Sequence, residues 1–293
     1  MDVSVIIVTY NTKQMTLECI QSIFQQTNGV VFEIILVDNA SNDGSKELFE
    51  QYEGITYIYS NKNLGFGKAN NLGYQYANGE YIFLLISDTI LLNNAIFYFY
   101  ESMKKASSDI GCMGCILFDI QNKPMHSYGY FPKMKHFFER IANFNIPNII
   151  KRTDLPESND NYPKYVDYIT GADLFIRRST IDNGGLFDPD FFMYFEETEM
   201  QYRYAKLGVK RQIINTPQIR HLAGGSSNKN RKHSLSSLIL EMKSRYIYCR
   251  KVMPSLSYHI IGLMHLLMIP RILVCRSPLN EKKRLIKLIF KNI

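Results

Sequence analysis

The sequence lacks the glycine-rich loop with which many nucleotide-binding folds begin. Val3–Thr9 is an apolar, β-branched run typical of a buried parallel strand, but Tyr10, Asn11 and Thr12 follow it where glycines would be needed. Without a G-x-G-x-x-G pattern there, a dinucleotide-binding dehydrogenase is excluded. The missing phosphate loop also argues against a nucleotidyltransferase.

The chain is also poor in cysteine and has no tryptophan. Its five cysteines form no regular framework, which argues against a secreted disulfide scaffold. Cys112 and Cys115 have C-x-x-C spacing, but they lie in an apolar stretch with no second pair, so we interpret them as small buried residues rather than a zinc or redox site. A basic leader segment is missing too, and strand-like Val3–Val8 stands in its place, so we expect a cytoplasmic protein.

Basic charge is scarce outside the C-terminal tail. From Lys229 onward there are 14 Lys and Arg against 2 Asp and Glu, a balance of +12 within a chain of net charge +7. Residues 1–228 therefore carry −5, which does not fit a nucleic-acid-binding body. A basic tail with long apolar runs indicates an anionic membrane surface instead.

The first hundred residues alternate strand and helix patterns. Four apolar runs predict strands, at Val3–Thr9, Phe32–Val37, Ile55–Tyr59 and Tyr81–Ile86. Helical patterns lie between them, at residues 16–25, 45–52 and 67–77. This alternation predicts βαβ crossovers and an α/β fold with a doubly wound, mostly parallel sheet. Further along the chain, strand character returns at residues 166–177 and 209–214, and helical character at 197–206 and 235–252.

Polar residues follow each of the four predicted strands, at positions 9–11, 38–41, 60–63 and 87–88. A single cluster of this kind is often only a helix cap or a turn. In parallel sheets, however, ligands bind beyond the carboxyl ends of the strands. Four clusters on one rim therefore predict a binding site.

Two acidic positions carry candidate chemistry. Asp88 ends the run YIFLLIS and brings one carboxylate to the rim, where Mg²⁺ or Mn²⁺ would prefer oxygen ligands. Glu196, Glu197 and Glu199 follow the aromatic stretch 191–195, whose bulk can raise carboxylate basicity as a general base requires. The alternative for these glutamates is the first turn of a helix, where acidic residues complement the dipole.

Several linked segments resemble glycosyltransferase family 2, most closely its rhamnosyltransferase-like branch. They are VSVIIVTYN, ILVDNASNDGS, NKNLGFGKANNLG and LLISDT in the first half, then GADLFIRRS, GLFDPDFFMYFEETEM and HLAGGSS. The resemblance covers roughly residues 3–250. It implies a GT-A fold and an inverting enzyme that moves a sugar from a nucleotide-diphosphate donor, a dTDP- or UDP-sugar such as rhamnose. The implied acceptor is a saccharide or lipid-linked saccharide in cell-surface polysaccharide synthesis.

The resemblance also implies roles for individual residues. Asp38 accepts from the N–H of a uracil or thymine ring, Tyr10 lies near the base, and Gly65 lets the backbone approach the ligand. Glu197 is the base, with Glu196 as the alternative. The implied donor site comprises Thr9, Tyr10, Asn11, Asp38, Asn63, Gly65, Asn71, Ser87 and Asp88, the acceptor side Gly171 and Ala172, and the metal ligands Asp88 and His221.

Two departures from the family pattern bear on activity. The metal motif reads Ile86-Ser87-Asp88, so its first carboxylate is missing and metal affinity is expected to be weaker. Glu197 stands where aspartate is commoner, which lengthens its reach. The implied mechanism is one in-line displacement with Mg²⁺ or Mn²⁺ on the departing diphosphate. The alternative is a non-catalytic nucleotide-sugar-binding relative.

The tail completes the predicted organisation. We expect a GT-A domain over residues 1–228, with nucleotide-sugar binding in 1–118 and the acceptor part in 119–228, and a basic helical extension over 229–293. Residues 256–275 are apolar but contain two histidines, a proline and an arginine, which favours an interfacial or re-entrant segment over a span. Residues 281–293 form a basic amphipathic pattern. We therefore expect a peripheral protein at the inner face of the cell membrane, with helices packed on the protein's own core as the alternative.

Overall fold

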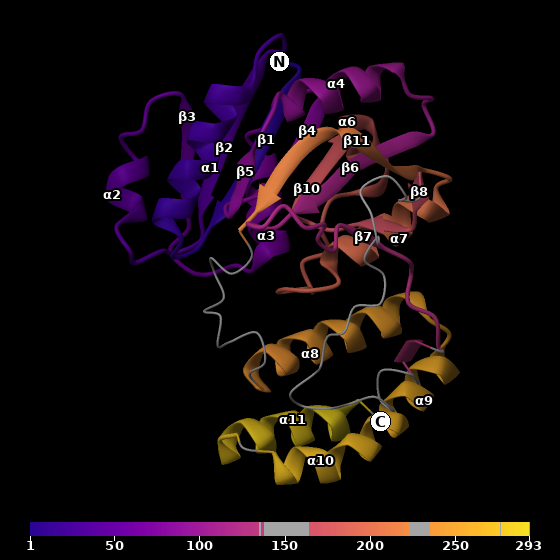
Figure 1. Ribbon diagram of the computed structural model, residues 1–293. Helices are drawn as coiled ribbons and strands as arrows, with labels where there is room; N and C mark the ends of the chain where they lie inside the picture. Colours follow the sequence, from indigo (N-terminus) through magenta and orange to yellow (C-terminus); the bar gives the residue numbers. More distant parts are fainter. Residues whose placement is uncertain (135, 138–163, 223–234, 276, 293) are drawn as a thin grey trace.

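A computed structural model describes residues 1–134, 136–137, 164–222, 235–275 and 277–292. It has an α/β body and, beneath it in Figure 1, a layer of C-terminal helices. Most of the predicted 119–165 insertion and the predicted domain boundary at residue 228 lie outside the described residues.

The four predicted strands and their parallel order are confirmed. They are β1 (Val3–Thr9), β2 (Phe32–Asp38), β3 (Ile55–Tyr59) and β4 (Tyr81–Ile86), and they lie in the order β3-β2-β1-β4. The crossovers are α1 (Lys13–Gln26), α2 (Ser45–Phe49) and α3 (Phe66–Tyr74). Thr9 pairs with Asp38, and Asp38 with Tyr59, so the polar residues after these strands meet at one edge.

The other half of the sheet is mixed. It continues β4-β10-β6-β11-β5, with β5 (Thr89–Leu91), β6 (Ile110–Phe118), β10 (Asp173–Arg177) and β11 (Lys210–His221). β10 runs antiparallel to both of its neighbours, whereas β11 is parallel to β6 and antiparallel to β5. The short strands are β7 (Tyr128–Gly129), β8 (Tyr165–Val166) and β9 (Tyr168–Ile169). The sheet is thus mostly parallel, with antiparallel strands in its second half.

Helices cover both faces of the sheet, as a doubly wound fold requires. α1 and α4 (Ala95–Lys105) pack on the face that carries Val5 and Ile7. α3, α6 (Arg178–Gly184) and α7 (Glu196–Lys206) pack on the opposite face, with Ile6. Successive side chains of a strand point to opposite faces, so a continuous apolar run serves both cores.

The same alternation explains Cys112 and Cys115 on β6. Three positions apart on a strand, the two thiols belong to opposite cores, and both are buried. Burial raises the pKa of Cys112 to about 12, so the thiolate that a metal or redox site needs is disfavoured. The interpretation of these cysteines as small core residues is confirmed.

The C-terminal layer consists of α8 (Leu235–Val252), α9 (Ser255–His265), the 3-10 turn η1 (Leu266–Met268), α10 (Ile269–Val274) and α11 (Leu279–Lys291). They share a core that includes Met242, Met268, Ile272 and Leu285. Ser255–Val274 is the one helical run in the described part of the chain that is long and apolar enough to cross a membrane. Only 28% of it is buried, and Leu256, Leu263 and Leu267 lie exposed on its outer side.

Candidate active site

A buried hydroxyl cluster joins the ends of β1 and β4. Thr9 Oγ1 lies 3.0 Å from Thr12 Oγ1 and 2.8 Å from Thr16 Oγ1. Thr12 Oγ1 in turn lies 3.1 Å from Ser87 Oγ. The hydroxyls of Thr9 and Ser87 therefore fix the rim beside Asp88, and their contact with a nucleotide stays a prediction. Thr12, which the motif analysis did not single out, links the two.

Asp38 stabilises the loop that follows β2. It is fully buried, and its oxygens accept hydrogen bonds from the Ser41 amide at 2.8 Å and from the Tyr57 hydroxyl at 2.8 Å. Burial and the bond to Asp38 raise the pKa of Tyr57, so its hydroxyl remains a donor. These bonds give Asp38 a structural role, and the contact with a base ring stays a prediction.

The first loop of the rim is open to solvent. Tyr10 is exposed, and Asn11 adopts a left-handed conformation with φ 55°. Asn11 Oδ1 accepts from the Asn42 amide at 2.8 Å, and the Asn11 amide donates to Ser41 Oγ at 3.0 Å. Asn11 thereby ties the loops after β1 and β2 together, and the contact of the exposed Tyr10 with a nucleotide base stays a prediction.

The loop before α3 meets the second half of the chain at Gly65. Gly65 has φ 81°, and a Cβ there would lie 2.1 Å from the Phe192 carbonyl oxygen. The Phe66 amide donates to that same oxygen at 3.0 Å. The resemblance predicted that this glycine admits a ligand, but the close approach that the structure requires is to Phe192. Asn63 holds the loop by accepting from the Gly65 amide and from Asn39, a residue that sequence reasoning missed.

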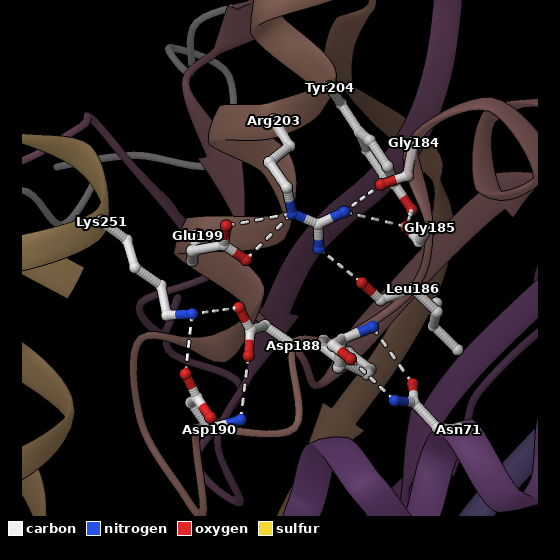
Figure 2. Close-up of polar contacts among 11 residues, drawn as sticks. Asn71, Gly184, Gly185, Leu186, Asp188, Asp190, Glu199, Arg203, Tyr204 and Lys251 are labelled. Carbon is white, nitrogen blue, oxygen red and sulfur yellow. Dashed lines mark hydrogen bonds and ion pairs between the residues drawn. The ribbon is translucent and has the colours of Figure 1, made fainter. Parts of the chain in front are cut away.

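Asn71 makes a second contact between the first and second halves of the chain. Its side-chain amide donates to the Phe187 carbonyl at 2.7 Å, and its oxygen accepts from the Phe187 amide at 3.1 Å. This paired contact occupies both functional groups of the side chain, as Figure 2 shows. Asn71 was predicted to line the donor pocket, but here its polar atoms hold the segment that precedes the candidate base.

Arg203 of α7 holds the same segment from another side (Figure 2). Its guanidinium pairs with Glu199 at 3.0 Å and donates to the carbonyls of Gly184 and Leu186. The i, i+4 spacing of Glu199 and Arg203 on a helix was the sequence signal for this contact. Residues 184–188 are therefore fixed by α3 and α7 together.

Asp88 and His221, the two predicted metal ligands, come together in the structure. The β5–β11 ladder pairs Thr89 with His221, and His221 Nε2 lies 3.5 Å from Asp88 Oδ1. Both side chains are partly accessible, at 12% for Asp88 and 20% for His221. Within the described residues no third His, Cys, Asp or Glu joins them in a metal-binding group. The pair therefore fits a hard cation that is shared with phosphate oxygens rather than one caged by protein.

The two candidate bases differ in environment. Glu196 is buried, and its Oε2 has no hydrogen-bond partner among the described residues. Burial, reinforced by the nearby Glu197, raises the pKa of Glu196 well above its usual range. Glu197 is only half-buried. Burial thus favours the protonated form of Glu196, whereas the neighbouring Glu197 keeps partial exposure to solvent.

Backbone and side-chain contacts connect the strand end at Asp88 with the start of α7. The Ile86 amide, just before Ser87 and Asp88, donates to the Ala172 carbonyl at 3.2 Å. Gly171, on the predicted acceptor side, faces the Phe66 ring, since a Cβ there would lie 3.0 Å from it. Gly67 follows Phe66 in the chain, and a Cβ at Gly67 would lie 3.7 Å from Glu196 Cβ. A continuous run of contacts therefore links the Asp88 position to the start of α7.

A sheet rim of polar strand ends, a carboxylate–imidazole pair and a partly exposed glutamate are the features expected of an enzyme that acts on a phosphate-bearing donor. Residues 4–155, just over half of the chain, match the family model of glycosyl transferase family 2. The chain belongs to this family.

Relatives and a solved structure agree with this assignment. Rhamnosyltransferase WbbL of Escherichia coli (strain K12) is 26% identical over 228 residues, which are 74% of this chain and 81% of WbbL. Glycosyltransferase GlyG of Streptococcus pneumoniae serotype 4 is 32% identical over 112 residues, 37% of each chain. The mannosyltransferase PcManGT from Pyrobaculum calidifontis, solved with GDP-Man and Mn²⁺, superposes with a TM-score of 0.60 at 15% identity over 99% of this chain and 86% of its own. The predicted GT-A fold is confirmed.

Proposed function

We propose that the protein is an inverting glycosyltransferase that moves a hexose from a nucleoside-diphosphate sugar to a hydroxyl of a saccharide or lipid-linked saccharide. The observation that carries the proposal is the rim itself. Asp88 and His221 lie 3.5 Å apart at the strand ends, and the half-buried Glu197 lies at the start of α7, which contacts through Ala172, Gly171 and Gly67 connect to Asp88. The donor is proposed to be a dTDP- or UDP-linked sugar, and rhamnose as that sugar is favoured by the likeness to the rhamnosyltransferase WbbL.

Each group has a separate task in this proposal. Tyr10, Asn11 and the loop of Asn63 bind the nucleotide, with Asp38 beneath them. Asp88 and His221 would hold Mg²⁺ or Mn²⁺, which neutralises the charge that develops on the leaving diphosphate. That two protein ligands suffice agrees with an ion that takes its remaining oxygens from phosphate and water.

Glu197 is the proposed general base. It takes the proton of the acceptor hydroxyl as that oxygen attacks the anomeric carbon opposite the diphosphate, so the configuration inverts in one step. Glu196 is less suited to this task because it is buried away from solvent and burial favours its protonated form. One reachable carboxylate fits a single displacement, in contrast to the carboxylate pair of a glycoside hydrolase.

We further propose that the C-terminal helices hold the enzyme at the inner face of a cell membrane. The outward residues Leu256, Leu263 and Leu267 of the Ser255–Val274 run are exposed. On α11, Lys283, Arg284 and Lys287 are exposed as well. An apolar stripe beside basic residues is the pattern of an interfacial helix on anionic lipid. Such a site would place the rim near lipid-linked acceptors.

The test combines binding with turnover. Thermal shifts are measured with UDP-glucose, dTDP-rhamnose and GDP-mannose, each with and without Mn²⁺, because a ligand that binds only the folded state raises Tm. The variant Glu197→Gln should keep the rise in Tm that the donor causes. Its rate of nucleoside-diphosphate release should fall by roughly 100-fold or more. Glu101→Gln, on the exposed face of α4, is the control. A variant Glu197→Gln with wild-type turnover, or no shift by any donor, would contradict the proposal, and binding without turnover in the wild type would indicate a non-catalytic relative.

A further inference from the structure

Helix α8 of the C-terminal layer lies directly against the segment that leads into the candidate base. Ser244 Oγ donates to the Met193 carbonyl at 2.6 Å, and Ser244 is buried. The rings of Tyr248 and Phe195 pack with centroids 5.3 Å apart. The tail therefore touches the chain immediately before Glu196, and it does so through a partly buried hydrogen bond and an aromatic contact.

Lys251, near the end of α8, secures the earlier part of the same segment. Its ammonium group lies 2.8 Å from Asp188 Oδ2 and 2.7 Å from Asp190 Oδ2, as Figure 2 shows. Asp188 also accepts from the Asp190 amide at 2.9 Å. The Lys251 ammonium group thus pairs with two carboxylates of one turn and holds that turn against α8.

The segment between these contacts has an unusual backbone. Tyr194 and Phe195 have φ of 72° and 66°, in the left-handed region that bulky side chains rarely adopt. Such a conformation persists only where surrounding contacts over-determine it, and it is found mostly at functional sites. Ser244 bonds to Met193, on one side of this pair, and Tyr248 packs on Phe195, so α8 supplies contacts that hold the strained turn.

The opposite side of α8 belongs to the C-terminal layer. Leu238 and Met242 pack in one core with Ile272 of α10 and Leu285 of α11. The helix thus contacts the turn before Glu197 on one side and α10 and α11 on the other, while Ile261 of α9 packs in the same core as Tyr248. Figure 1 shows the same arrangement, with α8 between the body and the layer formed by α10 and α11.

We propose that α8 is a positioning element for transfer, in which Ser244 and Lys251 hold the 188–195 segment so that Glu197 meets the acceptor hydroxyl. The inference rests on the proposed role of Glu197. It makes the C-terminal helices part of the catalytic unit as well as its anchor, and it places the membrane-facing surface one helix away from the base. Misplacing a reacting group by about 1 Å can cost roughly 100-fold in rate, so small shifts of this turn suffice.

The test separates positioning from folding and from donor binding. In the full-length protein, Ser244→Ala and Lys251→Met should each lower kcat for nucleoside-diphosphate release by roughly 10-fold or more. The KM for the donor and the Mn²⁺-dependent shift by that donor should change far less than kcat, because Asp88, His221 and the Tyr10 loop lie outside the 188–195 segment, although Phe192 contacts the donor loop at Gly65. Lys251→Arg keeps the cation near both carboxylates and should restore most of kcat. The control is Lys210→Met, which removes a 2.6 Å ion pair with Asp109 at the start of β11, at the other end of the strand from His221.

The outcomes distinguish this inference from the function on which it rests. If Glu197→Gln is inactive while Ser244→Ala and Lys251→Met turn over like wild type, the positioning role is wrong and the proposed function stands. If Glu197→Gln retains activity, the assignment of the base itself fails. A loss of kcat that Lys251→Arg does not restore, or that Lys210→Met reproduces, would also overturn the positioning role, because it would reflect general destabilisation. Lys251 is partly exposed, so its variants should fold even where Ser244→Ala does not.

Discussion

His221 Nε2 lies 3.5 Å from Asp88 Oδ1, although Asp88 precedes β5 and His221 ends β11, far along the chain. Strand pairing creates this contact. Thr89 pairs with His221 in the antiparallel β5–β11 ladder, and the Leu222 amide donates to the Asp88 carbonyl at 2.8 Å. Strand pairing thereby holds the His221 imidazole beside Asp88, the single carboxylate of the predicted metal motif Ile86-Ser87-Asp88.

This pairing predicts a metal defect in His221 variants. Removing the imidazole leaves Asp88 as the single protein ligand, so His221→Gln should weaken Mn²⁺ by roughly 10- to 100-fold. Mn²⁺ is titrated at a fixed saturating concentration of UDP, and the thermal shift is followed. His259→Gln, an exposed histidine of α9, is the control. Equal Mn²⁺ dependence in the two variants would exclude His221 from the metal site.

A second prediction concerns the contact between the two halves at Gly65. Alanine at Gly208, with φ 80° and no atom within 4 Å of the added Cβ, should cost only the left-handed backbone penalty, about 1–2 kcal/mol. Alanine at Gly65 adds a clash at 2.1 Å with the Phe192 carbonyl, which is backbone and cannot rotate away. Gly65→Ala should therefore lower the free energy of unfolding clearly more than Gly208→Ala, measured by denaturant titration. Equal losses would show that the approach to Phe192 is not tight in solution.

Much of the first half of the fold was predictable from sequence. The apolar runs of β1, β2 and β4 are buried on both faces, and that burial produces the pattern by which they were found, whereas β3 is a partly exposed edge strand. The second half was harder because β10 enters the sheet antiparallel between β4 and β6, a choice set by long-range pairing that no local pattern encodes. Helix α8 was predicted with its observed bounds, but its contact with the catalytic segment was not.

The candidate site shows the same division. The positions at strand ends were predictable because parallel strands bring their carboxyl ends together. The partners of Gly65 and Asn71 were not, since Phe192 and Phe187 lie more than a hundred residues further along the chain and no motif links them. Lys251 looked like one more basic residue of the tail until the structure placed it against Asp188.

Asp173 predicts how stability depends on pH. This carboxyl is fully buried on β10, and its Oδ2 accepts from the Cys115 amide at 2.7 Å. Burial raises the pKa of Asp173 from 3.8 to about 8, so the folded protein binds a proton that the unfolded chain has lost. The stabilising contribution is full below pH 4 and is lost as the pH rises through 8, by up to about 1.4 kcal/mol for each pH unit in that window.

Asp173→Asn should remove this dependence. Asparagine resembles the protonated carboxyl, so the free energy of unfolding of the variant should vary less between pH 5 and pH 8. As the pH rises, the stability of the variant should therefore increase relative to that of the wild type. Urea titrations at four pH values measure the slope. Asp182→Asn, at an exposed position of α6, is the control. Parallel profiles for Asp173→Asn and wild type would mean that Asp173 does not carry a proton in the fold.

The last prediction concerns the membrane. Leu256, Leu263 and Leu267 are 72%, 52% and 70% exposed, and their spacing of seven and four residues places them on one face. Replacing all three with serine should weaken binding to phosphatidylglycerol–phosphatidylcholine vesicles by roughly 10-fold or more, because each leucine that enters lipid contributes about 1.5–3 kcal/mol.

The matched control is a triple serine variant of Val31, Ile120 and Leu207, which are 61%, 61% and 55% exposed on the body. It should bind vesicles like the wild type in co-sedimentation. Basic residues on α11 add the electrostatic part, so wild-type binding should also fall with rising salt and on pure phosphatidylcholine. If the two triple variants lose binding equally, or if neither does, the outward face of Ser255–Val274 is not the membrane surface, and the basic face of α11 becomes the region to test.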